Sequence, residues 1–164
     1  LSTRKGVRKK PVGDTPQVVL ADDGLENDAH AGKWHRQVSF LAEASIAKAR
    51  DMGLEVGSGD FAENFTTEGI DLLDLPLGTQ LRLGKDVLVE ISQIGKVCHT
   101  RCAIYHLAGD CIFPREGIFG VVLHGGVVSV GDAIKVVKRG DGTCAHTPPE
   151  ALAEVESARK AGTL

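Results

Sequence analysis

The stretch TQLRLGKDVLVEISQI, residues 79–94, carries the clearest strand signal in the sequence. In its second half Val87, Val89 and Ile91 fall on one face of an extended chain, and Glu90 and Ser92 fall on the other. Alternation with a period of two is typical of a strand that has one face against a core. The stretch therefore predicts two successive strands, the second with one apolar face.

Further strand signals lie on both sides of this stretch. They are short apolar runs bounded by glycine or polar residues, at 18–21, 36–41, 117–123 and 127–137. The tripeptide HGG, residues 124–126, separates two β-branched runs, which predicts a hairpin between them. VGD at 130–132 predicts another tight turn or bulge. Twenty glycines among 164 residues fit many turns between short strands better than they fit long helices.

Two segments have helical composition. Residues 42–53, AEASIAKARDMG, are rich in Ala, Glu and Lys, and Gly53 is placed to end the helix. Near the C-terminus we expect a helix over about residues 148–161, with Thr147 as its N-cap and Glu150 completing a capping box. Its apolar stripe is thin, so we expect it to dock weakly or to project. Short strands with two or three helices predict a mainly β barrel or sandwich with closed or covered edges.

The composition is that of an ordinary globular domain. The chain is 42% hydrophobic and 25% charged, and its 164 residues suffice for one core. A net charge of −3 gives no basic excess, so nucleic-acid binding is not expected as the main task. Neither a membrane-spanning apolar run nor a signal peptide is visible, which predicts a cytoplasmic protein with reduced thiols and no membrane partner. The basic cluster at residues 4–10 is either a solvated terminus or a contact for an anion.

Three of the four cysteines fall within KVCHTRCAIYHLAGDC, residues 96–111. A disulfide staple is disfavoured in a reducing compartment and in a chain of this size. A structural zinc site normally uses two tight cysteine pairs, whereas this is one loose cluster, so zinc stands as an alternative only. A radical-type iron–sulfur cluster would need a third cysteine at position 105, which is Tyr105. One reactive thiolate, or buried cysteines without chemistry, are the remaining interpretations.

Cys102 is the candidate thiolate, because Arg101 precedes it and Lys96 and His99 are near it in sequence. Neighbouring cations lower the pKa of a thiol and make it a nucleophile or a ligand for a soft metal. If the segment were helical, Cys98 would share a face with Cys102.

The alternative is that the cysteines are small buried apolar residues, which free cysteines often are. We expect this for Cys111. For Cys144, on an expected surface tail, no role is indicated.

Several longer motifs occur in a fixed order along the chain. They are GLENDAHAG with RQVS (24–32 and 36–39), GDFAENFTTEGIDLLDLPLGTQLRLG (59–84), IGKVCHTRCAI (94–104) and PREGIFGVVLHGGVVSVGD (114–132). Together they resemble the MOSC domain, named after the C-terminal domain of molybdenum cofactor sulfurase, and in particular its small stand-alone bacterial members. The resemblance covers residues 4–137 and leaves 138–164 as a C-terminal tail.

The resemblance implies a MOSC-type β-barrel, of the kind grouped with the pyruvate kinase barrel domain, with a few peripheral helices. It also implies that the protein handles the molybdenum cofactor, which is of the molybdopterin type, or the sulfur destined for it. The family's hallmark is a cysteine that follows an arginine, and Arg101–Cys102 matches it. That cysteine is proposed to carry a persulfide or to ligate molybdenum, with Cys98 of the CHxxC variant as a possible partner thiol.

The cofactor's phosphate and pterin ring need cationic and amide partners, and the matching motifs supply candidates. The expected cofactor-binding residues are Asp28, His30, Arg36, Glu63, Asn64, His99, Arg101 and Arg115. Structural alternatives stand beside them. Asp and His also stabilise turns, the Glu63–Asn64 pair could form a turn, and Arg115 could pair with Glu116 at the surface.

Functions and partners follow from the same resemblance. No pyridoxal-phosphate domain fits in this chain, so a sulfur carrier of this kind needs a separate cysteine desulfurase to load it and an acceptor molybdoenzyme. One alternative is a molybdenum-dependent reductase of N-hydroxylated compounds, as some relatives are. A second is a zinc-stabilised binding domain without catalysis, so the sequence leaves open whether the protein is an enzyme.

Overall fold

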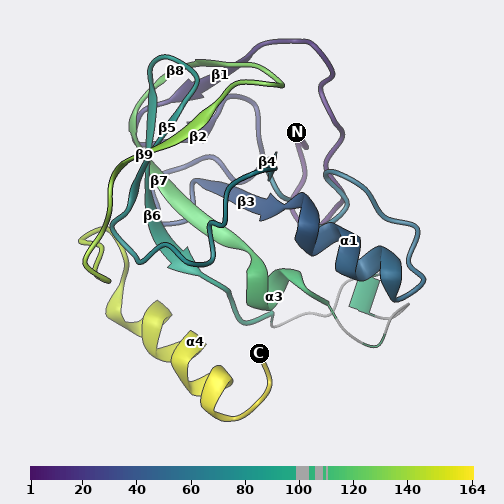
Figure 1. Cartoon of the computed structure of the whole chain (residues 1–164). Helices are drawn as coiled ribbons and strands as arrows, with labels where there is room; N and C mark the ends of the chain where they lie inside the picture. The colour runs from purple at the N-terminus through teal and green to yellow at the C-terminus, as the bar shows by residue number, and fades with distance from the viewer. Residues whose placement is uncertain (99–103, 106–108, 110) are drawn as a thin grey trace.

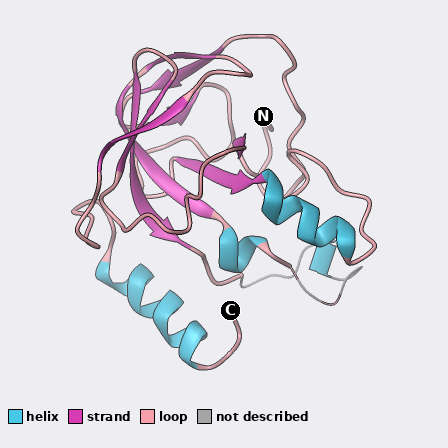
Figure 2. Cartoon of the chain, in the orientation of Figure 1, coloured by secondary structure: helices cyan, strands magenta, loops and turns pink. Residues whose placement is uncertain are grey.

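The computed structural model describes residues 1–98, 104–105, 109 and 111–164. These residues form a mainly β fold with two sheets, and helices α1, α3 and α4 lie at its periphery (Figure 1). Figure 2 shows the strands gathered in one curled body, with the helices beside one end of it. The mainly β, barrel-like fold predicted from the sequence is confirmed.

Among the described residues, the larger sheet has six strands. Their order is β4 (Phe65–Thr67), β3 (Val38–Ala42), β7 (Ile118–His124), β6 (Val87–Ile94), β5 (Gln80–Leu83) and β9 (Ile134–Lys138). Neighbours are antiparallel except β3 and β4, which are parallel. The stretch 79–94 forms β5 and β6, with Leu81 opposite Val89, and the apolar face predicted for its second half is buried.

The smaller sheet consists of β2 (Gly24–Leu25), β1 (Gln17–Leu20) and β8 (Gly126–Val128), in that order. The hairpin predicted at HGG is therefore wrong, because β8 pairs with β1 and not with β7. Both edges of β7 are already hydrogen-bonded, to β3 and to β6, so the following strand has no free edge there. Gly125 lets the chain cross to the other sheet: a Cβ on it would lie 2.6 Å from the carbonyl oxygen of Val19.

The turn predicted at VGD is confirmed. The Ser129 amide donates to Asp132 Oδ2 at 2.8 Å, the Asp132 amide donates to the Ser129 carbonyl at 3.1 Å, and Gly131 has a φ of +89°. The tight turn leads directly into β9, which pairs with β5.

The antiparallel pairing of β7 with β6 is irregular. The register between these strands shifts twice, between Leu88 and Val89 and between Ile91 and Gln93. Such bulges increase the local twist and curl a sheet. Gly120 lies in this part of β7, and a Cβ there would be 2.4 Å from Val89 Cγ1. The absence of a side chain at Gly120 therefore allows β6 to approach β7 closely. This close approach lets the six-stranded sheet curl into a half-barrel.

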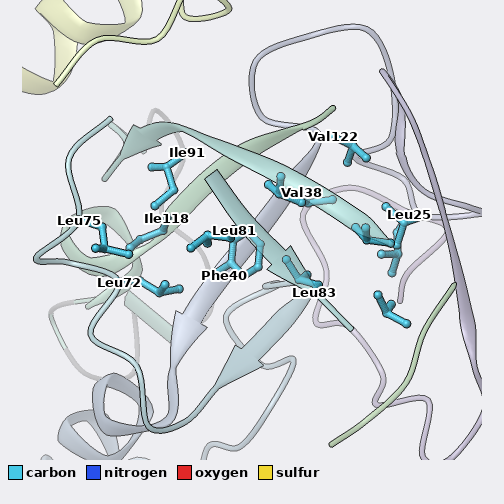
Figure 3. Close-up of a cluster of buried hydrophobic side chains, with 14 residues drawn as sticks. Leu25, Val38, Phe40, Leu72, Leu75, Leu81, Leu83, Ile91, Ile118 and Val122 are labelled. Atoms are coloured by element: carbon cyan, nitrogen blue, oxygen red, sulfur yellow. The ribbon is translucent and has the colours of Figure 1, made fainter. Parts of the chain in front are cut away.

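The main core fills the inside of the half-barrel (Figure 3). Phe40 of β3 is fully buried, and its ring stacks on Phe65 of β4 with centroids 5.1 Å apart. Leu25 and Val128 of the smaller sheet belong to the same cluster, so the two sheets share one core.

A second apolar cluster lies on the other side of the larger sheet. It joins α1 (Glu43–Asp51) and α3 (Phe113–Glu116) to the loop around Phe61 and to Phe119 of β7. Cys111 is 8% exposed and belongs to this cluster, so the prediction that it is a core residue is confirmed.

Helix α1 occupies the segment where the sequence predicted it, and Gly53 follows its end with a φ of +87°. Helix α4 (Pro149–Lys160) lies within one residue, at each end, of the helix predicted near the C-terminus. Its predicted capping box is wrong, because Thr147 instead donates its hydroxyl hydrogen to the Ser92 carbonyl at 2.5 Å. Val155 is the buried residue of α4, and Arg159 bonds the Ile94 carbonyl at 3.0 Å, so the helix docks on the end of β6.

Cys144 is buried, although the sequence predicted it on a surface tail. It is 9% exposed, and its Sγ donates to Glu90 Oε1 at 3.2 Å. Burial raises the pKa of this thiol. Cys144 and Thr147 therefore anchor the otherwise exposed segment before α4 to β6. No described helix is long and apolar enough to span a bilayer.

The half-barrel's curl gives a test of the fold. We expect Gly120→Ala to lower the free energy of unfolding by about 2 kcal/mol, because its Cβ overlaps Val89 and the Glu90 carbonyl. Urea unfolding measures the change. The matched control is Gly57→Ala, where nothing lies within 4 Å of the added Cβ, and a change within about 0.5 kcal/mol is expected. Equal effects in the two variants would contradict the account.

Candidate functional site

A pocket of about 190 Å³ opens on the second apolar cluster, on the outer side of the larger sheet. Its walls come from segments far apart in the sequence. The lining residues are Lys5, His30, Trp34, Arg36, Ser39, Phe61, Ala62, Lys96, Phe113 and Phe119. Of the described residues that line the pocket, three are cations and none is acidic. The pocket therefore favours an anion.

The cations of the pocket lie over aromatic rings. Arg36 Cζ is 4.9 Å from the centroid of the Trp34 ring and 5.6 Å from that of Phe119. Lys5 Nζ lies 5.4 Å from the Trp34 centroid, and Lys96 Nζ lies 5.4 Å from that of Phe113. Such contacts hold a cation in place without neutralising it, so its charge stays available to a ligand.

Arg36 is half-buried, and burial lowers the pKa of its guanidinium. Two groups oppose this effect by their charge, Glu154 of α4 and Cys98. Cys98 is exposed and begins the cysteine segment that the sequence singled out. Cys98 therefore lies near enough to Arg36 to influence the pKa of its guanidinium.

Hydrogen bonds fix the loop that carries Arg36. The Trp34 indole N–H donates to the His30 carbonyl at 2.8 Å, and His35 Nε2 bonds Gln93 Oε1 at 2.8 Å. The Ser92 hydroxyl also donates to the His35 carbonyl. Because Ser92 and Gln93 lie on β6, the rigid sheet sets the direction of the loop.

Asp28 does not line the pocket, but its hydrogen bonds fix two segments that do, the N-terminal segment and the loop that contains His30. Its Oδ1 accepts hydrogen bonds from Lys9 Nζ at 2.9 Å and from the His30 amide at 3.0 Å, and its Oδ2 accepts from the Ser2 amide at 3.2 Å. The side chains of Lys9 and Asp28 are each 1% exposed. Although burial raises the pKa of Asp28, hydrogen bonds from His30 and Lys9 bring it well below the usual carboxyl range. The buried ion pair thus ties the N-terminal segment to the loop that contains His30.

Glu63 and Asn64 also act from behind the pocket. Glu63 is 2% exposed, and its Oε1 accepts from the Gly59 amide at 2.5 Å and from the Thr66 hydroxyl at 3.0 Å. Asn64 Oδ1 accepts from the Ser39 amide at 3.0 Å, and Ser39 lines the pocket. Asn64 Nδ2 and Glu63 Oε2 are buried and have no hydrogen-bond partner among the described residues. The pair therefore shapes the loop beside the pocket and leaves a donor and an acceptor unused.

Ala62, next to Glu63, lines the pocket with a φ of +66°. The left-handed conformation costs a non-glycine residue about 1 to 2 kcal/mol. Strained backbone of this kind persists where the surrounding contacts over-determine it, and it clusters at functional sites.

The predicted residues thus have different places. His30 and Arg36 line the pocket, while Asp28, Glu63 and Asn64 support it from behind. Arg115 lies on α3, where the neighbouring Glu116 bonds Lys48 at 2.8 Å, and its predicted role in cofactor binding stays a prediction. His99, Arg101 and Cys102 lie outside the described residues, so their predicted roles stay predictions.

Sequence reasoning missed several lining residues, Lys5, Trp34, Lys96, Phe113 and Phe119 among them. Lys5 belongs to the basic cluster for which an anion contact was one interpretation, so a signal for it was present. The aromatic residues carried no such signal, because an isolated apolar residue predicts core as well as pocket. The described residues contain no group of three or more His, Cys, Asp or Glu side chains that could hold a metal ion.

The comparisons with known proteins agree on the fold. The family model of the MOSC domain matches residues 27–135. The crystal structure of YiiM from Escherichia coli superposes with a TM-score of 0.66 at 18% identity, covering 95% of this chain and 90% of that one. YiiM from Geobacillus stearothermophilus gives a TM-score of 0.60 at 22% identity, covering 93% of this chain and 80% of that one. A third structure, described as a hypothetical protein, gives 0.66 at 17% identity over 91% and 85% of the two chains. No curated protein matches the sequence.

The buried ion pair behind the pocket yields a prediction. Asp28→Asn should lower the free energy of unfolding by about 3 kcal/mol at pH 7, because it leaves the charge of Lys9 buried and unpaired. Chemical denaturation measures the loss. The matched control is Asp74→Asn, which removes an exposed pair with Arg139 and should cost less than about 1 kcal/mol.

The same variant has a pH signature. Because the folded-state pKa of Asp28 is below its unfolded value, the stability that it contributes is present above the unfolded pKa and is lost as the pH falls. The difference between the wild-type protein and Asp28→Asn should stay constant from about pH 8 to pH 5 and shrink below roughly pH 4. A difference that disappeared already near pH 6 would contradict this assignment.

Proposed function

Because the chain belongs to the MOSC domain family, we propose that its pocket binds the molybdenum cofactor through the cofactor's anionic phosphate and pterin ring. We further propose that Cys102 carries sulfur for this cofactor or ligates its molybdenum. The observation that supports the first part is the set of three cations, Lys5, Arg36 and Lys96, around a pocket whose described lining has no carboxylate.

The residues of the pocket fit such a ligand. Phosphate oxygens accept charge-assisted hydrogen bonds from Arg and Lys, and these are stronger when the donor is partly desolvated, as Arg36 is. A flat heterocycle can stack on the rings of Trp34 or Phe119. Ser39 is a neutral polar residue in the pocket lining, and its hydroxyl donates to Asn64 Oδ1 behind it at 3.1 Å. The pocket thus combines cationic and aromatic partners for a phosphorylated pterin.

When bound, the cofactor supplies a molybdenum centre that accepts a terminal sulfur ligand. The chain's own residues have simpler tasks. Arg36 and Lys96 hold negative charge, and the apolar rings of Phe113 and Phe119 exclude water from one side of the pocket. Cys98 is exposed and contributes to the electrostatics of Arg36, which supports it as a candidate thiol beside the ligand.

Loading of Cys102 with sulfur balances without an added oxidant. The Cys102 thiolate attacks the terminal sulfur of the persulfide held by a cysteine desulfurase. A new S–S bond forms at Cys102, the S–S bond of the donor breaks, and the donor's cysteine leaves as a thiolate. An electropositive environment favours this step, because it stabilises the attacking thiolate.

Copurified metal and pterin test the binding proposal. In protein from a molybdenum-replete host, we expect molybdenum and pterin together in the wild-type protein. In Arg36→Met both should fall, since loss of one charge-assisted hydrogen bond weakens binding by about ten- to a hundredfold. Plasma mass spectrometry measures the metal, and fluorescence after oxidation measures the pterin. The control is Arg82→Met, an exposed arginine on β5.

The same measurement separates the alternatives. Stoichiometric zinc without molybdenum, with stability unchanged in Cys102→Ala, would favour the zinc-stabilised binding domain and sink the proposal. Molybdenum with pterin, together with reduction of an N-hydroxylated substrate by the loaded protein, would favour the reductase over the carrier.

Sulfur loading tests the role of the cysteines. After incubation with a cysteine desulfurase and cysteine, we expect the intact mass of the protein to increase by one sulfur atom, and a thiol to remove that sulfur. Cys102→Ala should abolish the increase. Cys98→Ala should retain it if Cys98 is only a neighbour, and should slow its release if Cys98 is the resolving thiol. An unchanged increase in Cys102→Ala would overturn the assignment of the carrier.

A further inference from the structure

Three cations and three aromatic rings form one row of successive contacts along the pocket. In order they are Lys5, Trp34, Arg36, Phe119, Phe113 and Lys96, and each neighbouring pair has a measured separation between 4.9 and 5.6 Å. The row has a cation at each end and Arg36 in its interior. Two places for negative charge follow from this order, one on each side of Arg36.

The first place lies at Trp34. Lys5 Nζ and Arg36 Cζ are 5.4 and 4.9 Å from the centroid of this one ring. Lys5, Trp34 and Arg36 also line the same pocket, and a phosphate monoester has three terminal oxygens that can accept hydrogen bonds from two cations. The second place lies between Arg36 and Lys96, over the Phe119 and Phe113 rings.

Lys5 reaches the pocket because its segment is fixed. The Lys9 side chain is buried against Asp28, and the Lys9 amide donates to the Gly59 carbonyl at 2.8 Å. Gly59 allows this contact, since a Cβ there would lie 2.3 Å from the Lys9 carbonyl oxygen. Lys5 lies outside residues 27–135, the part that the family model matches, so the family match assigns it no role.

The N-terminal segment also carries an excess of positive charge compared with the rest of the chain. Residues 4–10 hold five of the 19 Lys and Arg residues, and none of the 22 Asp and Glu residues lies in them. Lys9 is used in the buried pair, and Arg8 pairs with Asp60 at 3.3 Å. Among the described residues Lys5 forms no ion pair, so its charge is available to the pocket.

We propose that Lys5 and Arg36 together form a phosphate-monoester subsite on the ring of Trp34, and that this subsite selects phosphorylated aromatic ligands over their dephosphorylated forms. This proposal rests on the proposed function, since it assigns one end of the pocket to the cofactor's phosphate. Lys96 is two residues from Cys98, so the ligand's other, reacting end lies toward Lys96 and the cysteine segment. The N-terminal segment is then a wall of the binding site, and Asp28 is a positioning residue for it.

Trp34 provides the measurement, because it is the only tryptophan of the chain and its fluorescence reports on this subsite. The probes are guanosine monophosphate and guanosine, which differ by one phosphate. Their guanine base contains the same aminopyrimidinone ring as a pterin. We expect the monophosphate to change the fluorescence at a lower concentration than guanosine does. Added salt should weaken this preference, since Lys5 is exposed and its charge is screened.

The variants separate the subsite from general charge. Lys5→Met should weaken monophosphate binding by about tenfold and leave guanosine binding unchanged. Lys5→Arg should restore the preference. The matched control is Lys10→Met, an exposed lysine of the same segment that does not line the pocket, and it should bind like the wild-type protein. Circular dichroism and the urea midpoint confirm that each variant is folded.

Three results would overturn the proposal. They are equal affinity for the two probes, an unchanged preference in Lys5→Met, or an equal loss in Lys10→Met. Its failure is distinguishable from failure of the proposed function. If molybdenum copurifies but the fluorescence response does not depend on Lys5, the subsite is rejected and the proposed function stands. A Lys5-dependent phosphate preference in protein that never holds molybdenum rejects the cofactor and keeps the subsite.

Discussion

Strand β7 is hydrogen-bonded along both edges, and this constrains where the rest of the chain can go. With β3 on one side and β6 on the other, the residues that follow β7 cannot fold back on it and instead cross to the smaller sheet. The two faces of β7 serve different cores. Ile118 and Val122 enter the main core inside the half-barrel, whereas Phe119 enters the second cluster and lines the pocket. This interior strand of the larger sheet therefore also supplies a residue that lines the site.

The buried Lys9–Asp28 pair fixes the N-terminal segment, which contributes Lys5 to the pocket. An ion pair of which each side chain is 1% exposed is not strong evidence of net stability, since removing two charges from water costs nearly as much as their attraction returns. An unpaired buried charge is costly, however, so the pair favours the docking of the N-terminal segment in which Lys9 meets Asp28. The pair thus places Lys5 beside Trp34 without touching a ligand itself.

The electrostatics of the site follow from where its charges are neutralised. Behind the pocket, the carboxylate of Asp28 is matched with a cation, and Glu63 Oε1 is matched with a backbone amide and a hydroxyl. At the pocket itself, Lys5, Arg36 and Lys96 lie over aromatic rings, which hold them but do not cancel their charge. Of the three cations, Arg36 is the one whose desolvation is relieved by a bound anion. A half-buried guanidinium gains more from such an anion than an exposed one does.

The sequence by itself determined the local structure and the family. Alternation in residues 79–94 gave β5 and β6, the composition of 42–53 gave α1, and the order of motifs indicated the domain that the family model then matched. Only the tertiary structure decided that β8 pairs with β1, that Cys144 is buried, and that cations from three distant segments meet over shared rings. The reason is physical. Hydrophobic periodicity acts over a few residues and is visible in a local pattern, whereas strand partners and converging side chains depend on which edges and faces remain free once the whole sheet has closed.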